Sequence, residues 1–235
     1  RNYKWLNYND PDRIYRQMDL CWKYGVRKIW ITNVGDLKPM EFPIQLFLDM
    51  AWNPEKFSVE KCLAEFADTQ FPAADLKTRN EIADIMHTYA HMAHRRTAEL
   101  LNADTFSFNY DEWPRVMGEW DALEKRSEAA GSALPERYTA AYEQLVLFPV
   151  QAMTNVYRMY YAAACGRQAD VEKYYSTDRE LMNHYNHEIS GGKWNHMMDQ
   201  THIGYRWWQE PRKDVMPTAK SIEPLPERII APSAA

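Results

Sequence analysis

The stretch from Ile29 to Pro54 restricts how this chain of 235 residues can fold more than any other part of its sequence. An apolar run ends at Val34, a polar loop follows, and an amphipathic helix begins at Pro43. A strand, a loop and a helix in this order form the repeating unit of parallel α/β folds. Such folds place their chemistry at the carboxyl ends of the strands. The stretch therefore predicts a strand-loop-helix unit whose loop carries a candidate site.

The residues before this unit predict a second one. Residues 3–7 have the pattern of a short strand, and Asp10-Pro11 starts a helix, because Asp caps a helix N-terminus and Pro suits its first turn. Residues 28–34 then form the next strand. Two parallel strands are too few for a stable domain, since a parallel sheet is covered on both faces. We therefore expect residues 1–54 to be the edge of a larger sheet, completed by chain outside this sequence or by a partner.

After Phe57 the pattern becomes wholly helical. Apolar residues recur at helical spacing, and five long helices with short connections are typical of a bundle. Pro149 interrupts the fourth of them and is expected to kink it. Residues 55–205 are thus predicted to form an α-helical bundle domain, and residues 206–235 a linker or tail toward an absent domain. The five helices are expected to begin near Ser58, Ala74, Asp111, Pro135 and Asp170.

Composition argues against several classes of partner. The net charge of −5 speaks against general nucleic-acid binding, and no apolar run has the length of a membrane-spanning helix. The three cysteines are far apart and show no C-x-x-C spacing, so we expect neither a zinc site nor a redox pair, and no cofactor is predicted. Most of the nine Trp and fifteen Tyr residues are ordinary core material, although flat aromatic rings also suit the C–H faces of sugars.

The loop after the second strand carries the main candidate residues. Asn33, Asp36 and Lys38 supply an amide, a carboxylate and an ammonium group at the carboxyl end of a strand, where parallel α/β folds bind ligands. Asn7 holds the same position after the first strand. A simpler interpretation is that Asp36 caps a turn after Gly35 and that Lys38 is only solvated. Both interpretations are open at this stage.

Histidines on two predicted helices raise the question of a metal. His87, His91 and His94 share one helix face, and a pair at i, i+4 can hold one ion. A third ligand a further turn along rarely converges on the same ion, so we expect a solvated face or one packed against a neighbouring domain. His184 and His187 suit the negative end of the last helix and are expected to be structural. We predict no metal site.

Residues 191–205 are dense in polar and aromatic side chains but show no clear periodicity. Loops often carry function. An irregular buried segment also needs many side chains to satisfy its backbone, so a docking role is equally open. Trp194 and His202 are the best individual candidates, and His202 joins the predicted substrate-binding residues.

Several runs of residues span nearly the whole chain: Trp30–Pro43, Phe47–Asp49, Ala51–Pro54, Arg95–Leu101, Gln144–Val150, Tyr185–Glu188 and Gly191–Tyr205. In this order they resemble glycoside hydrolase family 115, and runs of this length are far more specific than a short motif. The resemblance implies part of a xylan α-1,2-glucuronidase. Such an enzyme removes glucuronic acid or its 4-O-methyl ether from the side branches of xylan.

The resemblance also implies an architecture. The family is described as a (β/α)8 barrel followed by a helical bundle and a β-sandwich, usually as a dimer. Residues 1–54 would then be the last two strand-helix units of the barrel, residues 55–205 the bundle, and residues 206–235 the link to an absent sandwich. The expected fold class is mainly α. Glucuronoxylan or its oligosaccharides are the expected partners, and the expected location is secreted or periplasmic.

The implied chemistry is inversion at the anomeric carbon. It needs a carboxylic acid and a carboxylate about 6.5–9.5 Å apart, and we identify neither in this chain. On the resemblance, we expect Asn33 to donate a hydrogen bond to the sugar. Lys38 would balance the uronate or hold Asp36, which would orient Asn33 or accept a sugar hydroxyl. The alternative is a non-catalytic helical scaffold or carbohydrate-binding module, and the sequence upstream of Arg1 would discriminate the two.

Overall fold

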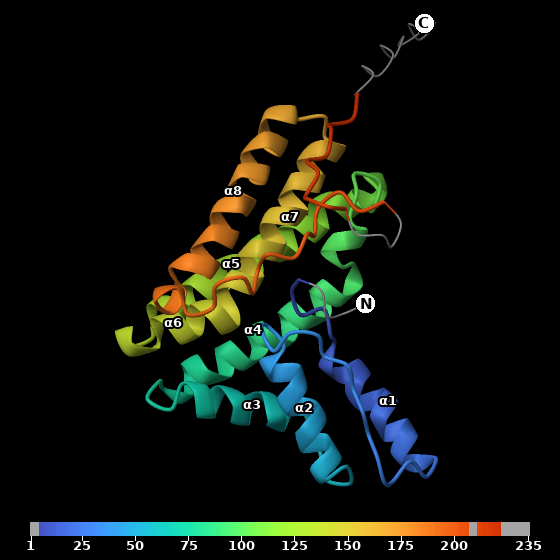
Figure 1. Cartoon of the computed structure of the whole chain (residues 1–235), viewed down its shortest axis with the longest axis vertical. Coiled ribbons are helices and arrows are strands. Elements are labelled where there is room, and N and C mark those ends of the chain that lie inside the picture. Colours follow the sequence, from blue (N-terminus) through green and yellow to red (C-terminus); the bar gives the residue numbers. More distant parts are fainter. Residues whose placement is uncertain (1–4, 207–210, 222–235) are drawn as a thin grey trace, which may run out of the picture.

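The computed structural model describes residues 5–206 and 211–221, and over these ranges the chain is mainly helical, with no β-strand (Figure 1). Short 3-10 turns lie at residues 98–100, 109–111, 136–138 and 189–192, and residues 143–147 form a π-helical turn, η4. None of the helices in these ranges is long and apolar enough to span a membrane. The α-helices are α1 (Pro11–Lys23), α2 (Glu41–Trp52), α3 (Val59–Gln70), α4 (Leu76–Arg95), α5 (Glu112–Ser132), α6 (Thr139–Tyr142), α7 (Phe148–Ala164) and α8 (Gln168–His187).

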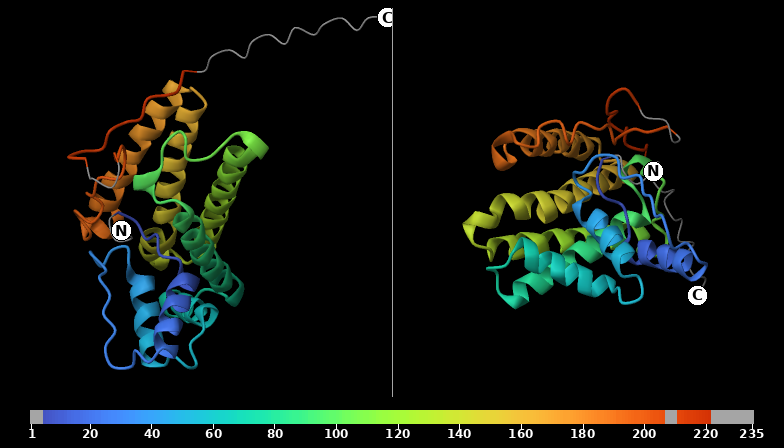
Figure 2. Two further views of the ribbon diagram at one scale, coloured as in Figure 1. Left: turned by 90° about the vertical axis from the view of Figure 1, so that its right-hand side faces the viewer. Right: turned by 60° about the horizontal axis from the view of Figure 1, so that its bottom comes forward.

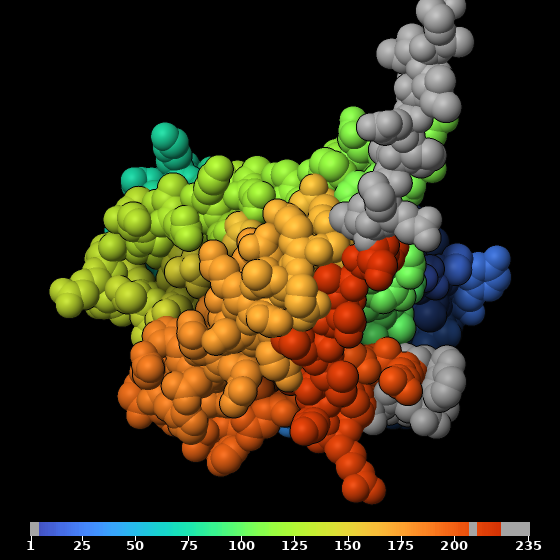
Figure 3. Space-filling view, turned by 90° about the horizontal axis from the view of Figure 1, so that it is seen from above, coloured from blue at the N-terminus to red at the C-terminus, as the bar shows by residue number. Residues whose placement is uncertain are grey.

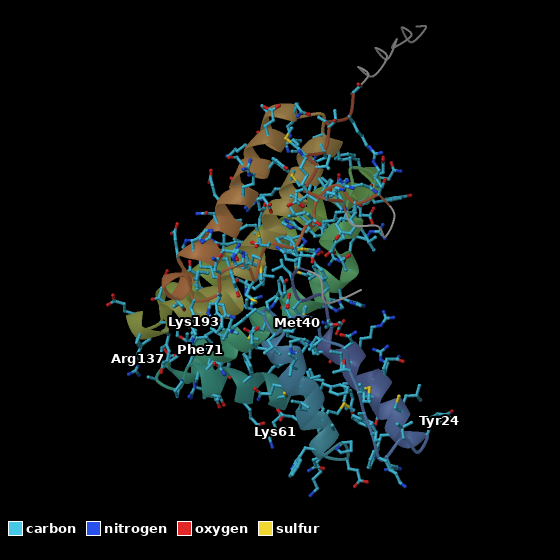
Figure 4. The ribbon with its side chains drawn as sticks, in the orientation of Figure 1. Tyr24, Met40, Lys61, Phe71, Arg137 and Lys193 are labelled. Atoms are coloured by element: carbon cyan, nitrogen blue, oxygen red, sulfur yellow. The ribbon has the colours of Figure 1, made fainter. Side chains whose placement is uncertain are left out.

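Helices α4, α5, α7 and α8 form a bundle, and α1 and α2 extend from one end of it (Figures 1 and 2). Tyr24 marks the end of α1 that lies farthest from the bundle (Figure 4). Helix α7 packs against both α5 and α8 and is buried around most of its circumference, so it is the central helix of the bundle. Residues 211–221 run beside α7 and α8 (Figure 3), where the Lys220 amide donates to the carbonyl of Ala163.

Local capping explains where helices α1, α3 and α4 begin. A carboxylate oxygen of Asp10 accepts hydrogen bonds from the amides of the first turn of α1, and the Ser58 hydroxyl does the same for α3. Both starts confirm the prediction. The helix predicted to begin near Ala74 is α4, which begins after its cap Asp75 and ends at Arg95. Arg96 is extended, and its carbonyl accepts a hydrogen bond from the Tyr157 hydroxyl instead of from the next turn of a helix.

The predicted disturbance at Pro149 takes the form of a π-helical turn. Residues 139–164 form one continuous helical run, and η4 (Glu143–Leu147) widens it just before the proline. Proline has no amide hydrogen and its ring crowds the carbonyl four residues earlier. A wider turn at that carbonyl relieves the crowding. The long helix therefore passes Pro149 without ending.

The two predicted strands are not formed in the described residues. Residues 5–9 and 28–34 have no strand pairing, and residues 3–4 lie outside the described ranges. A strand needs a partner for its backbone hydrogen bonds, and an apolar pattern does not show whether one is present. Ile29 and Ile31 are 71% and 89% exposed, so these two apolar side chains have no cover. The described residues therefore do not confirm the predicted strands.

Two apolar clusters hold the elements together. The larger unites the bundle with Trp5, Leu6 and Tyr8, which are fully buried although they precede the first helix. The smaller packs Phe42 and Leu46 of α2 against α3. Both clusters combine residues from before and after position 54. The predicted domain boundary between residues 1–54 and 55–205 stays a prediction.

Candidate functional site

The loop between the segment 28–34 and α2 is anchored to the bundle through Lys38. The Lys38 ammonium lies 2.5 Å from a Glu41 carboxylate oxygen and 3.0 Å from Oε1 of Gln144, and Gln144 in turn donates to Glu41. The ammonium also lies over the ring of Trp194, 4.1 Å from its centroid. Because Lys38 and Glu41 are largely buried, this charged pair fixes the start of α2 against η4.

Asn33 lies at a different surface. It is exposed and lines a cavity of about 520 Å³ between the segment 32–34 and helices α1 and α2. Asn9, Arg13, Met40 and His94 line the same cavity. Figure 4 places Met40 where α2 meets the bundle. The cavity offers amide, guanidinium and imidazole groups beside apolar walls, a combination that suits a polar organic ligand.

Asp36 lines a third space, a polar groove of about 530 Å³. The opposite wall comes from residues 196–201, and Arg212 contributes from the segment that follows. Asn33, Asp36 and Lys38 therefore face three different surroundings. Their predicted roles in substrate binding stay predictions.

Asn7 is buried and closes a local turn. Its Oδ1 accepts hydrogen bonds from both the amide and the side chain of Asn9, each at 2.9 Å. It also lines a small cavity of about 30 Å³ with Glu41 and Gln144. The predicted Asn7 site thus lies next to the Lys38 anchor.

His202 is almost fully buried, with 1% of the residue exposed. Its Nε2 lies 3.0 Å from a carboxylate oxygen of Asp178, and its Nδ1 lies 2.9 Å from the carbonyl of Gln200. Burial alone would lower the pKa of His202, but the Asp178 carboxylate, aided by Asp214, raises it above the usual value. Both ring nitrogens face acceptors, so the geometry fits an imidazolium that donates twice. Its predicted contact with substrate stays a prediction.

Asp178, His202 and Asp214 place one ligand atom each within 4.8 Å of one another, as a metal site would. The hydrogen bonds oppose that interpretation. The Asp214 carboxylate already accepts from the amides of His202 and Ile203, at 2.7 and 2.8 Å. The His202 nitrogens are used as described above. The cluster fits a buried hydrogen-bond network that holds the segments around His202 and Asp214 to α8.

The histidine face of α4 packs against the N-terminal segment and α1. His87 Nε2 lies 2.6 Å from Asp12, and His91 Nδ1 lies 3.2 Å from Asp10. His94 Nδ1 lies 2.9 Å from the carbonyl of Tyr8. Each imidazole faces its own partner, so the three do not converge on one point. This face thus packs partly against the N-terminal segment and α1, while His91 stays largely exposed, and whether these elements form a separate domain stays a prediction.

His184 is likewise structural. Its two ring nitrogens lie 2.6 Å from Glu143 and 2.7 Å from Glu188. Partial burial lowers the pKa of His184, but these two carboxylates outweigh it and raise the pKa overall. The ion pairs tie the end of α8 to the π-helical turn.

Sequence reasoning missed the residues opposite Asp36. His196 and Asp199 form an ion pair with 2.6 Å between Nδ1 and Oδ2, and both line the groove that Arg212 completes. The available signal was a histidine and an aspartate three residues apart in an irregular polar segment. Arg212 gave no signal, because it comes from a segment taken as a tail.

Comparisons with known proteins agree with the resemblance. Residues 1–100 match the family model described as glycosyl hydrolase family 115. A solved structure described as a novel family 115 4-O-methyl-α-glucuronidase, BtGH115A, with specificity for decorated arabinogalactans, is similar with a TM-score of 0.73 and 25% identity. Both findings support glycoside hydrolase family 115 for this chain. A search of curated proteins found no match.

The family 115 matches differ in extent. The family model covers Asn7, Asn33, Asp36 and Lys38 but ends before His196. The structural likeness covers 95% of this chain and 32% of the glucuronidase, so this chain spans about a third of the length of that protein.

Proposed function

We propose that this chain is part of a glycoside hydrolase that removes glucuronic acid or 4-O-methylglucuronic acid from a polysaccharide. The observation that carries the proposal is the likeness of nearly the whole chain to a 4-O-methyl-α-glucuronidase. The family match over the loop that carries Asn33, Asp36 and Lys38 supports it. Residues 1–54 would form the last two units of a (β/α)8 barrel, and residues 55–205 the helical domain.

The uncovered apolar segment supports the barrel. Ile29 and Ile31 project from an extended segment that follows α1 and precedes α2, the position of a barrel strand between two helices. Neighbouring strands of a barrel would bury both side chains. The Lys38 anchor then keeps the loop after this strand at a fixed distance from the helical domain. Asn33 would present its amide to the sugar, and Asp36 would accept from a hydroxyl.

Two polysaccharides compete as substrate. The resemblance favours xylan, with inverting cleavage of an α-1,2 linkage. The similar solved structure is described with specificity for decorated arabinogalactans, which favours that class instead. We propose xylan as the first candidate. A secreted or periplasmic location and a homodimer belong to the same proposal, and the family resemblance is their support.

The test uses the complete protein and both substrates. Release of uronic acid from glucuronoxylan and from uronic-acid-decorated arabinogalactan is measured for the unmodified protein and for Asn33→Ala. One lost hydrogen bond in the transition state predicts about a tenfold fall in kcat/KM. Asn80→Ala is the matched control, since Asn80 is exposed on α4, away from the loop. No uronic acid released from either polysaccharide would contradict the proposal.

A further inference from the structure

The groove beside Asp36 contains a histidine held in a strained backbone conformation. His196 has φ of +71°, in the left-handed region that non-glycine residues adopt at a cost of about 1 kcal/mol or more. Such a conformation persists only when its surroundings fix it. Lys193, three residues earlier, lies near the end of α8 (Figure 4). The surroundings of His196 therefore hold its backbone in this conformation.

A chain of hydrogen bonds orients that side chain. Nδ1 of His196 lies 2.6 Å from one carboxylate oxygen of Asp199, and the other oxygen accepts from Nδ2 of Asn186 at 2.7 Å. Asn186 belongs to α8, is 5% exposed, and also accepts from the Met198 amide. A buried amide on a rigid helix thus fixes the carboxylate, and the carboxylate fixes the imidazole. Within the described residues, Nε2 of His196 has no partner and is left for a ligand.

Three separate segments supply the polar groups of the groove. Asp36 comes from the loop before α2, His196 from the segment after α8, and Arg212 from the segment that runs beside α7 and α8. Neither the Asp36 carboxylate nor the Arg212 guanidinium has a hydrogen-bond or ion-pair partner among the described residues. The volume of about 530 Å³ is enough for a small ligand such as one sugar ring.

Charge indicates which kind of sugar fits. Two carboxylates, Asp36 and Asp199, line the groove, against one guanidinium and one imidazole. A uronate carboxylate would meet two groups of its own sign. Hydroxyl groups instead donate to a carboxylate and accept from a guanidinium or an imidazole. A neutral pyranose matches this set better than an acidic one.

We propose that this groove is a subsite for a neutral sugar of the polysaccharide, contacted by Asp36, His196 and Arg212, with Asp199 as a positioning residue for His196. The proposal rests on the proposed function for its saccharide ligand. It adds a binding site at the junction of the loop and the helical domain.

Binding, measured apart from hydrolysis, tests the subsite. Undecorated xylo-oligosaccharide, undecorated galacto-oligosaccharide and free glucuronate are each titrated into the complete protein by calorimetry or NMR. For His196→Ala we expect about tenfold weaker binding of a neutral oligosaccharide, as for one lost hydrogen bond, and unchanged binding of glucuronate. His187→Ala is the matched control, because His187 is exposed at the end of α8.

Further variants separate direct from indirect roles. Asp199→Asn keeps the shape of the side chain but weakens its hold on the imidazole. For Asp199→Asn we expect a smaller loss of neutral-sugar affinity than for His196→Ala, together with a change in the pH profile of binding. His196→Gln keeps a hydrogen-bond donor, so it should retain part of the affinity that His196→Ala loses. Thermal unfolding of each variant checks that the fold is intact.

The outcomes distinguish this subsite from the proposed function. Loss of glucuronate binding in His196→Ala would overturn the choice of a neutral sugar, and unchanged binding of every probe would overturn the subsite. If neutral sugar binding depends on His196 but no uronic acid is released from any polysaccharide, the subsite stands and the proposed hydrolase does not.

Discussion

Trp5 lies flat on the imidazole of His202, with ring centroids 3.5 Å apart and 6° between the ring planes. The contact joins the N-terminal segment to the segment that follows α8. Asp178 on α8 binds the edge of the same imidazole. A cationic ring under an indole is stabilised by the negative face of the indole. The segment that precedes the first helix and the segment that follows α8 therefore meet at the buried His202.

Replacing Trp5 by alanine tests this contact. Trp5 is fully buried and its indole Nε1 lies 3.2 Å from the sulfur of Met182. Removal of a buried Trp should lower the free energy of unfolding by about 3–5 kcal/mol. Trp52→Ala is the matched control, because Trp52 is 92% exposed in this chain and its loss should change stability by less than about 0.5 kcal/mol. Chemical denaturation of both variants makes the comparison, and equal effects would contradict the buried contact.

The His202 network predicts a defined pH dependence. The folded-state pKa of His202 is raised above the unfolded value of about 6.5, by the carboxylates of Asp178 and Asp214 acting against burial. The stabilisation is therefore fully present below about pH 6.5 and is lost as pH rises through the folded-state pKa. The stability advantage over His202→Gln should shrink across that range. Denaturation of both proteins at a series of pH values measures this difference in unfolding free energy. The other titrating groups are common to both proteins. A difference that grows with pH would contradict a protonated His202.

The sequence predicts an element well when the interactions that form it join residues close together in the chain. The starts of α1 and α3 depend on Asp10 and Ser58, whose caps reach only two or three residues along the chain. Such signals are complete in the sequence. A strand over 28–34 instead needs a partner strand, and Ile29 and Ile31 give no information on whether one is present. Helices were therefore predicted well and strands were not.

The site was harder to predict, because its contacts join distant residues. Lys38 meets Gln144, and Asp36 shares a groove with His196 and Arg212. No periodicity brings such residues together before the bundle is folded. The loop itself was found, since the boundary between an apolar run and a helix is a local pattern. Its partners in the bundle were not.

The Lys38 anchor predicts a measurable coupling. Lys38→Ala leaves the partly buried Glu41 without its cation, so the free energy of unfolding should fall by about 1–3 kcal/mol. The double variant Lys38→Ala/Glu41→Gln should lose less than the sum of the two single variants, by about 0.5 kcal/mol or more. Lys61→Ala is the control, because its ion pair with Glu65 is exposed and should contribute less than about 1 kcal/mol. Strict additivity in the cycle would show that the contact is not energetically coupled.

The close approach of Gly204 to Val215 predicts that alanine at Gly204 and alanine at Gly118 have opposite effects on stability. Gly204 has φ of +80°, and a Cβ there would lie 2.6 Å from the carbonyl oxygen of Val215. Gly204→Ala should therefore destabilise the protein by about 2–4 kcal/mol, through strain and overpacking together. Gly118 lies inside α5 with open space around its Cβ position, so Gly118→Ala should stabilise by about 0.5–1 kcal/mol. Thermal and chemical unfolding of the pair checks the turn, and a tolerated Gly204→Ala would mean that residues 211–221 do not pack against it as described.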